Sequence, residues 1–252
     1  MLAHEIHGQG DRVAILLHGF LGSARNLGTL ARRWAERDPS RRLVAADLTG
    51  HGSSPPLPPG ADLGTLAGDV LALANHLALA QPVEIVGHSL GGRVALKAAL
   101  LAPHAVGPLT LLDIAPGPIE FGDFVLQALV DAPAHPTDRA SVRELLRERG
   151  VPPNIADWLL MNLVRDESGL RWRVDRTALA ELRARGNVED LWPAVESGRT
   201  RIRAIRGGQS GYVTDEAAAR MQQAGVRVDT IPGAGHFIHI DAPGPLLDLL
   251  TS

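Results

Sequence analysis

The chain of 252 residues contains no cysteine. This absence excludes a disulfide framework, a thiolate nucleophile and a metal site with cysteine ligands. A surplus of positive charge is missing too, because 25 Lys and Arg residues stand against 28 Asp and Glu residues and give a net charge of −3. A chain without a basic surplus offers little to a phosphate backbone, so we expect no nucleic-acid partner.

Long hydrophobic stretches are also missing. None approaches the roughly 20 apolar residues that span a bilayer. Residues 1–20 lack the basic start and the apolar run of a secretory signal. The sequence therefore predicts a cytoplasmic protein without a membrane span, as a monomer or a dimer. A chain of this length is expected to form one or two domains with a large core.

What the sequence does contain is a series of short apolar runs separated by helix-like segments. The runs lie at 13–17, 43–46, 83–86, 109–112 and 202–205, and an alternating run follows at 226–231. Such runs suit parallel strands that are buried on both faces. Helix-like segments intervene at 27–37, 66–79 and 91–101. This alternation predicts an α/β fold with a mostly parallel central sheet flanked by helices.

The segment 119–199 interrupts the pattern and contains no strand-like run. Its helical signals are one apolar face, a capping box at Ser141 and Glu144, and further helices at 155–164 and 177–185. We therefore expect a core made of residues 1–118 and 200–252 and a helical cap made of residues 119–199. The cap is expected over the edge where open α/β sheets bind ligands.

The strongest chemical signal is Gly87-His88-Ser89-Leu90-Gly91, which joins an apolar strand to an apolar helix. This context is typical of a nucleophile elbow, in which a serine occupies a strained turn and flanking glycines relieve the crowding. Ser89 is therefore the candidate nucleophile. The alternative interpretation is a glycine-rich turn without catalytic meaning.

A serine hydroxyl needs a base, and His236 is the best candidate because it lies in a glycine-rich loop after the last strand. The acid is less obvious, because Ser210 stands where many enzymes of this fold have aspartate. Asp113 ends the strand next to the nucleophile strand and is our candidate, with Ser210 assisting. The alternatives are a loop histidine for His236 and a loop-bracing salt bridge for Asp113. Asp215 and Glu216 look like the first residues of a helix.

Acyl transfer also needs donors for the developing oxyanion, and backbone amides serve best because they need no reorganisation. The amide of Leu90, directly after the nucleophile, is one candidate. The amide of Phe20 is the other, with that of Leu21 as second choice. The run 47–54 resembles a phosphate-binding loop but lacks the Lys-Ser/Thr ending, so we interpret it as a structural turn.

These motifs resemble those of the α/β-hydrolase superfamily and, more narrowly, those of the small YbfF-like esterases and their eukaryotic abhydrolase relatives. The matching pieces are LLHGFLGSARN (16–26), DLTGHGSSP (47–55), GHSLGGRVAL (87–96), LDIAP (112–116), LLMNLV (159–164), RWRV (171–174), GGQSGYV (207–213) and GAGHFIHID (233–241). The resemblance implies an α/β-hydrolase fold with a small helical cap after the sixth strand. It also implies an acid after that strand, which carries over to Asp113, with Ser210 in the usual acid position. The chain departs from many relatives at Leu90, where they have methionine.

We therefore expect a serine carboxylesterase that hydrolyses short- to medium-chain acyl esters through an acyl-enzyme, acts on a small-molecule ester, and needs no metal or organic cofactor. Leu21 and His88 are candidate substrate-binding residues. The cap contributes further candidates, although helical spacing makes such residues core more often than ligand contacts: Phe121, Phe124, Trp158 and Leu159.

Three alternatives remain open. Thioester or lactone hydrolysis would use the same apparatus. A menaquinone-pathway-type lyase is a second possibility, because Arg93 matches a substrate-holding position in that family, although Ser210 replaces its acid. A low-turnover small-molecule receptor or interaction protein is the third, and it belongs to a different class of function.

Overall fold

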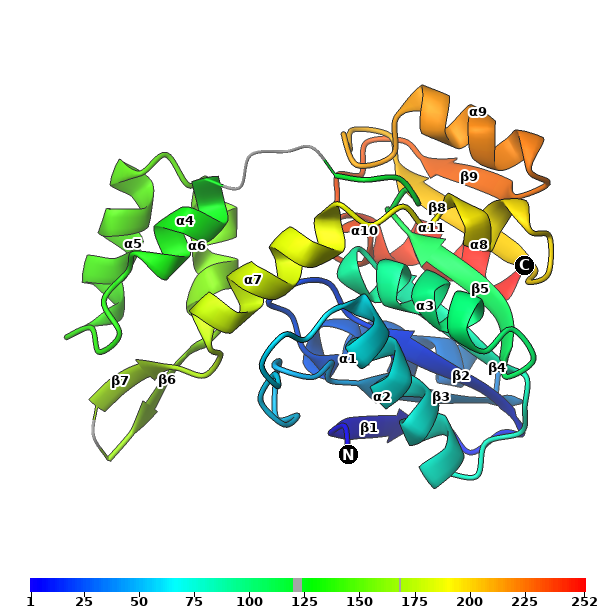
Figure 1. The fold of residues 1–252 in the computed structure, drawn as a ribbon, viewed down its shortest axis with the longest axis horizontal. Coiled ribbons are helices and arrows are strands. Elements are labelled where there is room, and N and C mark those ends of the chain that lie inside the picture. The colour runs from blue at the N-terminus through cyan, green and yellow to red at the C-terminus, as the bar shows by residue number, and fades with distance from the viewer. Residues whose placement is uncertain (120–123, 168) are drawn as a thin grey trace.

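The computed structural model describes residues 1–119, 124–167 and 169–252. Its centre is a seven-stranded sheet in the order β1-β3-β2-β4-β5-β8-β9 (Figure 1). The strands are β1 (His4–His7), β2 (Arg12–Leu17), β3 (Arg41–Ala46), β4 (Val83–His88), β5 (Val106–Leu112), β8 (Ile202–Gly207) and β9 (Arg227–Ile231). β1 pairs antiparallel with β3, and every other pair in this sheet is parallel. The predicted mostly parallel sheet is thus confirmed.

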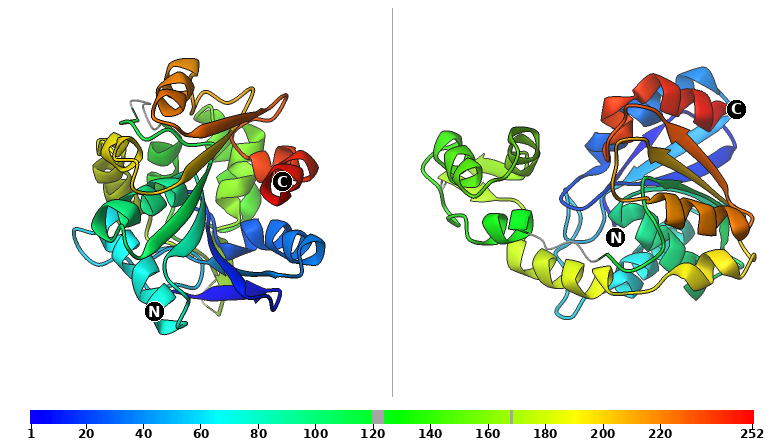
Figure 2. Two further views of the ribbon diagram at one scale, coloured as in Figure 1. Left: turned by 90° about the vertical axis from the view of Figure 1, so that its right-hand side faces the viewer. Right: turned by 90° about the horizontal axis from the view of Figure 1, so that it is seen from above.

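Helices cover both faces of the sheet (Figure 2). They are α1 (Ala24–Arg37), α2 (Leu63–His76), α3 (Leu90–Leu101), α8 (Trp192–Glu196), α9 (Asp215–Gln223), α10 (Ile238–Asp241) and α11 (Pro243–Thr251). In β2, Ile15 and Leu17 pack in one core with α2 and α3, while Ala14 and Leu16 pack in a second core with α1 and α11. Burial on both faces is why the strand runs are continuously apolar. In the described part of the chain, no helix has the length and apolar character to cross a membrane.

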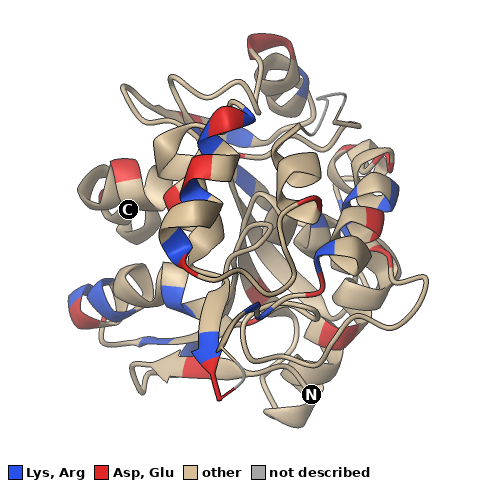
Figure 3. Cartoon of the chain, turned by 90° about the vertical axis from the view of Figure 1, so that its left-hand side faces the viewer, with Lys and Arg blue, Asp and Glu red and all other residues tan. Residues whose placement is uncertain are grey.

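A separate group of elements lies between β5 and β8. It comprises α4 (Phe124–Val130), α5 (Arg139–Glu148), α6 (Pro153–Leu160), β6 (Leu163–Asp166), β7 (Gly169–Trp172) and α7 (Arg176–Asn187). Figure 1 shows these elements to one side of the sheet, with α7 leading back to the core. Acidic and basic residues are intermixed on the face that they present (Figure 3). The resemblance implies a cap after the sixth strand, whereas in chain order this group follows the fifth strand, β5. The boundary between cap and core stays a prediction.

Three local expectations for this insertion were wrong. The predicted helix at 155–164 ends at Leu160, and β6 and β7 form a two-stranded antiparallel hairpin where no strand was expected. Strands of four residues are too short for alternation to be read against a helical background. The helix expected to begin at Ser141 begins earlier, because the carboxylate of Asp138 accepts the Ser141 N–H at 2.8 Å and caps α5.

The loop at 47–54 behaves as a structural turn. The carboxylate of Asp47 accepts the N–H of Ala24 at 2.6 Å and that of Ser53 at 2.7 Å. A single buried side chain thereby joins the start of α1 to the loop after β3. This contact uses the carboxylate to satisfy backbone donors, as turns with aspartate commonly do.

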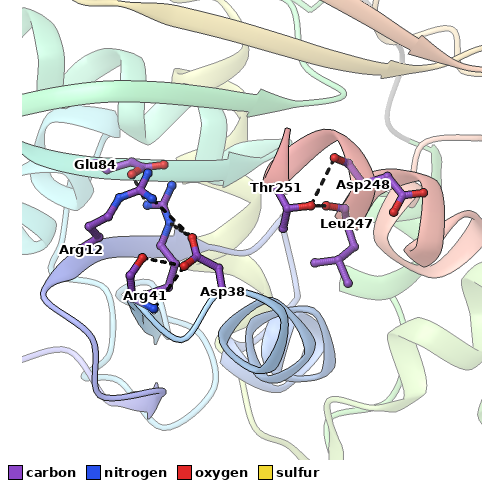
Figure 4. Close-up of polar contacts among 8 residues, drawn as sticks. Arg12, Asp38, Arg41, Glu84, Leu247, Asp248 and Thr251 are labelled. Atoms are coloured by element: carbon purple, nitrogen blue, oxygen red, sulfur yellow. Dashed lines mark hydrogen bonds and ion pairs between the residues drawn. The ribbon is translucent and has the colours of Figure 1, made fainter.

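The amino ends of the strands are fixed by ion pairs (Figure 4). Arg41, the first residue of β3, pairs with Glu84 of β4 and lies 3.6 Å from Asp38. Arg12, the first residue of β2, lies 3.4 Å from the same Asp38. The guanidinium of Arg41 also lies 4.9 Å from the Trp34 ring centroid. Since β2, β3 and β4 run parallel, their amino ends lie together. These contacts therefore stabilise the end of the sheet opposite the carboxyl ends of the strands.

Candidate active site

Ser89 stands alone between β4, which ends at His88, and α3, which begins at Leu90. Its backbone has φ 51° and ψ −117°, a strained conformation for a residue with a Cβ. The neighbouring glycines explain how the turn is made. A Cβ on Gly91 would lie 2.4 Å from the Leu17 carbonyl oxygen, and one on Gly87 would lie 2.4 Å from Gly91. The tight packing that these glycines allow pushes the serine out at the end of the strand.

The structure brings the three predicted catalytic residues into contact. His236 lies in the loop after β9, and its Nε2 is 3.0 Å from Ser89 Oγ. Its Nδ1 is 2.7 Å from Asp113 Oδ2. A nitrogen beside a carboxylate carries the proton, so Nδ1 donates and Nε2 is left to accept the serine hydroxyl. This arrangement prepares Ser89 for deprotonation.

Asp113 follows β5 and is fully buried, with 0% of its surface exposed. Its carboxylate accepts the Gly207 N–H at 2.9 Å and the Ser210 hydroxyl at 2.5 Å, in addition to the His236 ring. A buried charge with three donors is compensated within the protein. Asp215, by contrast, has a side chain that is 88% exposed and pairs with Arg206 at 2.7 Å, and Glu216 follows it in the first turn of α9.

Aromatic and imidazole rings surround His236. The ring of Tyr212 is stacked on it with centroids 3.7 Å apart and planes 17° apart. His88, one of the predicted substrate contacts, donates its Nε2–H to the His236 carbonyl at 2.9 Å. Burial holds the pKa of His88 well below its usual value, and it lowers the pKa of His239, 4.7 Å from His88, to about 4. The loop that carries His236 is therefore held by neutral rings.

The loop after β2 forms a turn in which the Gly22 N–H donates to the Gly19 carbonyl at 3.0 Å. Leu21 within it has φ 59°. Among the described residues, the backbone hydrogen bonds outside helices and strands include none donated by the amide of Phe20 or of Leu90. Burial lowers the pKa of His18 to about 4, and its Nδ1–H donates to the Gly19 carbonyl at 2.7 Å. This neutral histidine braces the turn.

A cavity of about 490 Å³ opens over Ser89 and His236. Four of the predicted substrate-binding residues line it, namely Leu21, His88, Phe124 and Trp158. Phe121 lies outside the described residues. Other lining residues are Phe20, Leu27, Ile155, Tyr212 and Phe237, so the walls are largely apolar and aromatic.

Two further residues do not belong to the cavity. Leu159 is fully buried in the hydrophobic core and does not appear in the cavity wall, because its side of α6 faces inward. Arg93 is buried as well, and its guanidinium donates to the carbonyl oxygens of Gly117, Gly186 and Glu189. Its donors hold the ends of the insertion rather than a substrate. Within the part of the chain that the structure describes, no group of three or more His, Asp or Glu side chains is arranged to hold a metal ion.

Sequence features missed Tyr212, which lies two residues after Ser210 in the loop after β8. The motif at 207–213 includes this tyrosine, but a motif does not predict that its ring stacks on His236. Asn162, at the turn between α6 and β6, was also missed. It is a buried polar residue among apolar ones, and that contrast was the available signal.

Comparisons with known proteins agree with this geometry. The model of the alpha/beta hydrolase family matches residues 14–249. The sn-1-specific diacylglycerol lipase ABHD11 of Mus musculus is 29% identical over 248 residues, which cover 94% of this chain and 79% of the mouse protein. Esterase YbfF of Escherichia coli (strain K12) is 29% identical over 256 residues, 92% of this chain and 89% of that protein.

Among solved structures, a marine microorganism esterase superposes with a TM-score of 0.86 at 23% identity, over 99% of this chain and 98% of the other, which supports the fold. The sheet order, the strained serine after β4 and the family match over most of the chain lead to one assignment. The chain belongs to the alpha/beta hydrolase family and is a carboxylic ester hydrolase.

Proposed function

We propose that this enzyme is a serine carboxylesterase that works through an acyl-enzyme, with Ser89 as nucleophile, His236 as general base and acid, and Asp113 as the acid of the triad. The observation that carries the proposal is the unbroken hydrogen-bond path from Asp113 through His236 to Ser89 at the cavity. The order and distances fit the roles that a triad requires.

Acylation begins when Ser89 Oγ attacks the ester carbonyl carbon while His236 Nε2 takes the hydroxyl proton. The charge that develops on the carbonyl oxygen is stabilised by the amides of Phe20 and Leu90. The intermediate then collapses, the C–O bond to the alcohol breaks, and Nε2 gives its proton to the leaving oxygen. Asp113 stays ionised throughout and stabilises the imidazolium, while the Ser210 hydroxyl and the Gly207 amide hold the carboxylate in place.

Deacylation repeats these steps with water. His236 Nε2 takes a proton from the water that attacks the acyl carbon, the same two amides stabilise the second intermediate, and the bond to Ser89 Oγ breaks. The proton returns to the serine oxygen, and the carboxylic acid leaves. The two half-reactions together convert one ester and one water molecule into one alcohol and one carboxylic acid.

The substrate proposed is a small-molecule ester with a short to medium acyl chain. Apolar and aromatic side chains dominate the wall of the 490 Å³ cavity, and Trp158 and Phe237 approach each other to 5.5 Å between ring centroids. Apolar walls favour an acyl chain over a polar group. Thioesters and lactones present the same carbonyl chemistry and remain candidates. The lyase alternative loses the support that Arg93 gave it, because Arg93 does not line the cavity. A cytoplasmic location stays a prediction.

The experiment is to treat the purified protein and its Ser89→Ala variant with a fluorophosphonate and with p-nitrophenyl acetate. We expect covalent labelling and a burst of nitrophenol from the natural sequence and neither from the variant. Absence of labelling in the natural sequence would overturn the proposal. Labelling with slow turnover on every ester of a panel graded by acyl length would favour the receptor alternative.

A further inference from the structure

We propose that Asn162, in the insertion between β5 and β8, is a positioning residue for the turn of residues 19–22 after β2, which we call the oxyanion loop. The insertion would then complete the catalytic site as well as cover it. This inference rests on the proposed function, because it concerns the amides that stabilise the oxyanion beside Ser89. The contacts that carry it join two segments 141 residues apart.

The first step concerns the turn itself. The Leu21 backbone has φ 59°, in the left-handed region that glycine adopts easily and leucine does not. A β-turn whose third residue has positive φ, as in type II, differs from the commoner type I turn chiefly in the orientation of its central peptide unit. In the turn of residues 19–22, that unit joins Phe20 to Leu21. A strained conformation of this kind persists only where neighbouring groups hold it.

The second step identifies the groups that hold it. The Leu21 carbonyl and the Gly22 N–H belong to one peptide unit. Its N–H donates to the Gly19 carbonyl at 3.0 Å, and its carbonyl accepts the Asn162 side-chain Nδ2–H at 2.8 Å. Both ends of this unit are therefore bonded, one within the loop and the other to the insertion. The contact with Asn162 is buried, so water does not compete for either partner.

Asn162 is itself fixed within the insertion. Its N–H donates to the Leu159 carbonyl at 3.0 Å, and its own carbonyl accepts the Arg173 N–H at 2.7 Å. The guanidinium of Arg139, at the start of α5, donates to the carbonyls on either side, those of Leu160 at 2.7 Å and of Leu163. The Asn162 side chain has only two rotatable bonds and its backbone is fixed by these contacts. Its amide group therefore has a defined position, from which it donates to the Leu21 carbonyl.

A second contact between the insertion and the loop supports the same conclusion. The guanidinium of Arg183 in α7 lies 4.9 Å from the centroid of the Phe20 ring. Phe20 supplies one of the proposed oxyanion amides, and Leu21 follows it directly. The insertion therefore contacts both central residues of the turn, through a ring face at Phe20 and through a hydrogen bond at Leu21.

This arrangement has a kinetic consequence that simple stabilisation does not have. Oxyanion donors strengthen their bonds in the transition state, so displacing one lowers kcat while leaving substrate binding nearly unchanged. A displacement of about 1 Å from a mutation outside the reacting groups can cost on the order of 100-fold in rate. We therefore expect loss of the Asn162 donor to lower kcat by roughly tenfold to 100-fold, with KM changed less than about threefold.

The test uses Asn162→Leu, which keeps the side-chain volume without a donor, and Asn162→Ala, which serves if the first does not fold. For each variant, kcat and KM on p-nitrophenyl butyrate are measured together with the inhibition constant of an aryl trifluoromethyl ketone, which forms a tetrahedral oxyanion on the serine. We expect the inhibition constant to rise by the factor by which kcat falls. The shape of the pH profile should not change, since the path from Asp113 to Ser89 is untouched.

The matched control is Arg185→Met. Arg185 in α7 donates its Nε–H to the Ala61 carbonyl at 2.9 Å, so it also joins the insertion to the core but does not reach the oxyanion loop. We expect its kcat, KM and inhibition constant to stay within about twofold of the natural sequence, with thermal melts confirming that all proteins are folded. An equal loss of kcat in Arg185→Met, or unchanged kcat in a folded Asn162 variant, would overturn the inference about Asn162 but not the proposed function. No labelling or turnover by the natural sequence would overturn both proposals.

Discussion

The role that we propose for Asp113 depends on the groups that surround it in the folded chain. It is buried with a backbone amide, a hydroxyl and an imidazole as donors, so its charge is directed at His236. Ser210 occupies the loop where the sequence leads one to look for an acid, and it supports the carboxylate that comes from β5 instead. Two segments thus share one task, the charge coming from one and a hydrogen-bond donor from the other.

We expect Asp113→Asn to lower kcat by on the order of 1,000-fold or more, because an amide in this position favours the wrong tautomer of His236 and cannot stabilise the imidazolium. Steady-state kinetics with p-nitrophenyl acetate and circular dichroism would measure activity and folding. The control is Asp215→Asn, which removes an exposed carboxylate paired with Arg206 and should leave kcat nearly unchanged. Damage by the control and not by Asp113→Asn would show that the acid is wrongly assigned.

Tyr212 presents its ring face to His236 at 3.7 Å. A ring face attracts a cation, and in the proposed mechanism the imidazole becomes cationic in the transition state, so we expect the stack to favour catalysis. We expect Tyr212→Leu to reduce kcat by about threefold to 30-fold, which corresponds to roughly 0.5–2 kcal/mol. Tyr212→Phe keeps the ring and should retain most of the activity. Equal losses in both variants would point to the hydroxyl instead of the ring face.

The residues that the sequence identified and those it missed differ in a physical way. Ser89 stands in a motif of neighbours, and His236 and Asp113 follow apolar strands whose ends meet at one edge of a parallel sheet. Local pattern and topology therefore suffice to bring them together, as the structure does. Asn162 acquires its partner only when the insertion packs on the loop after β2. No local pattern predicts that contact.

At the scale of elements, the same contrast holds. The central strands are predictable because burial on both faces makes them continuously apolar, and β2 to β5 lie where the runs indicate. β1 was missed, since its residues His4–His7 form a short edge strand with a half-exposed, mostly polar pattern. The β6–β7 hairpin was missed because each of its strands has only four residues, too few to show an alternating pattern. Element prediction thus succeeds where a strand leaves a clear apolar or alternating pattern, as in β9 (Arg227–Ile231), and fails for the short, mostly polar strands.

The turn from β4 into α3 needs glycine at position 91 because α3 approaches β2 closely there. Replacing glycine by alanine at this position and at an open position in α2 tests this requirement. We expect Gly91→Ala to destabilise the protein by about 1–3 kcal/mol or more and to lower kcat, because the new Cβ would lie 2.4 Å from the Leu17 carbonyl oxygen and would push α3 away from β2. Gly68→Ala in α2 is the matched control. A Cβ there meets nothing within 4 Å, so we expect a gain of roughly 0.5–1 kcal/mol.

Urea unfolding measures both free energies of unfolding. The two variants carry the same chemical change in helices that lie side by side, so only the space around the new methyl group differs. If Gly91→Ala were as stable as the natural sequence and equally active, the account of the elbow as a close approach between α3 and β2 would be wrong.

At the scale of the whole molecule, the site is surrounded by histidines that burial keeps neutral. Burial lowers the pKa of His18 to about 4, that of His51 to about 3 and that of His239 to about 4. His18 and His51 lie beside the oxyanion loop, with ring centroids 5.2 Å apart, so protonation of either opposes protonation of the other. The candidate site therefore lies among rings that add no charge near neutral pH.

These shifts predict that the protein loses stability in mild acid. Each of the three histidines has its ordinary pKa near 6.5 in the unfolded chain and a lower one when folded, so between pH 6.5 and about 4 the unfolded state binds more protons. Stability is therefore fully present above pH 6.5 and falls as the pH drops through this window. Each histidine contributes up to about 1.4 kcal/mol per pH unit, so we expect a loss of roughly 3–4 kcal/mol by pH 5.5.

Urea unfolding at pH 7.5, 6.5 and 5.5 measures this loss, and the His51→Asn variant tests its origin. Asparagine can keep the donor that His51 offers to the Thr49 carbonyl at 3.1 Å but cannot be protonated. We expect the variant to be less stable than the natural sequence at pH 7.5, because a well-packed ring is lost. Between pH 6.5 and 5.5, however, it should lose about 1 kcal/mol less stability than the natural sequence. A parallel fall of both proteins would place the acid sensitivity in other groups. Convergence of the two curves toward pH 5.5 would show that the buried imidazole of His51 contributes its share of the acid sensitivity, because only the natural sequence must then protonate this ring on unfolding.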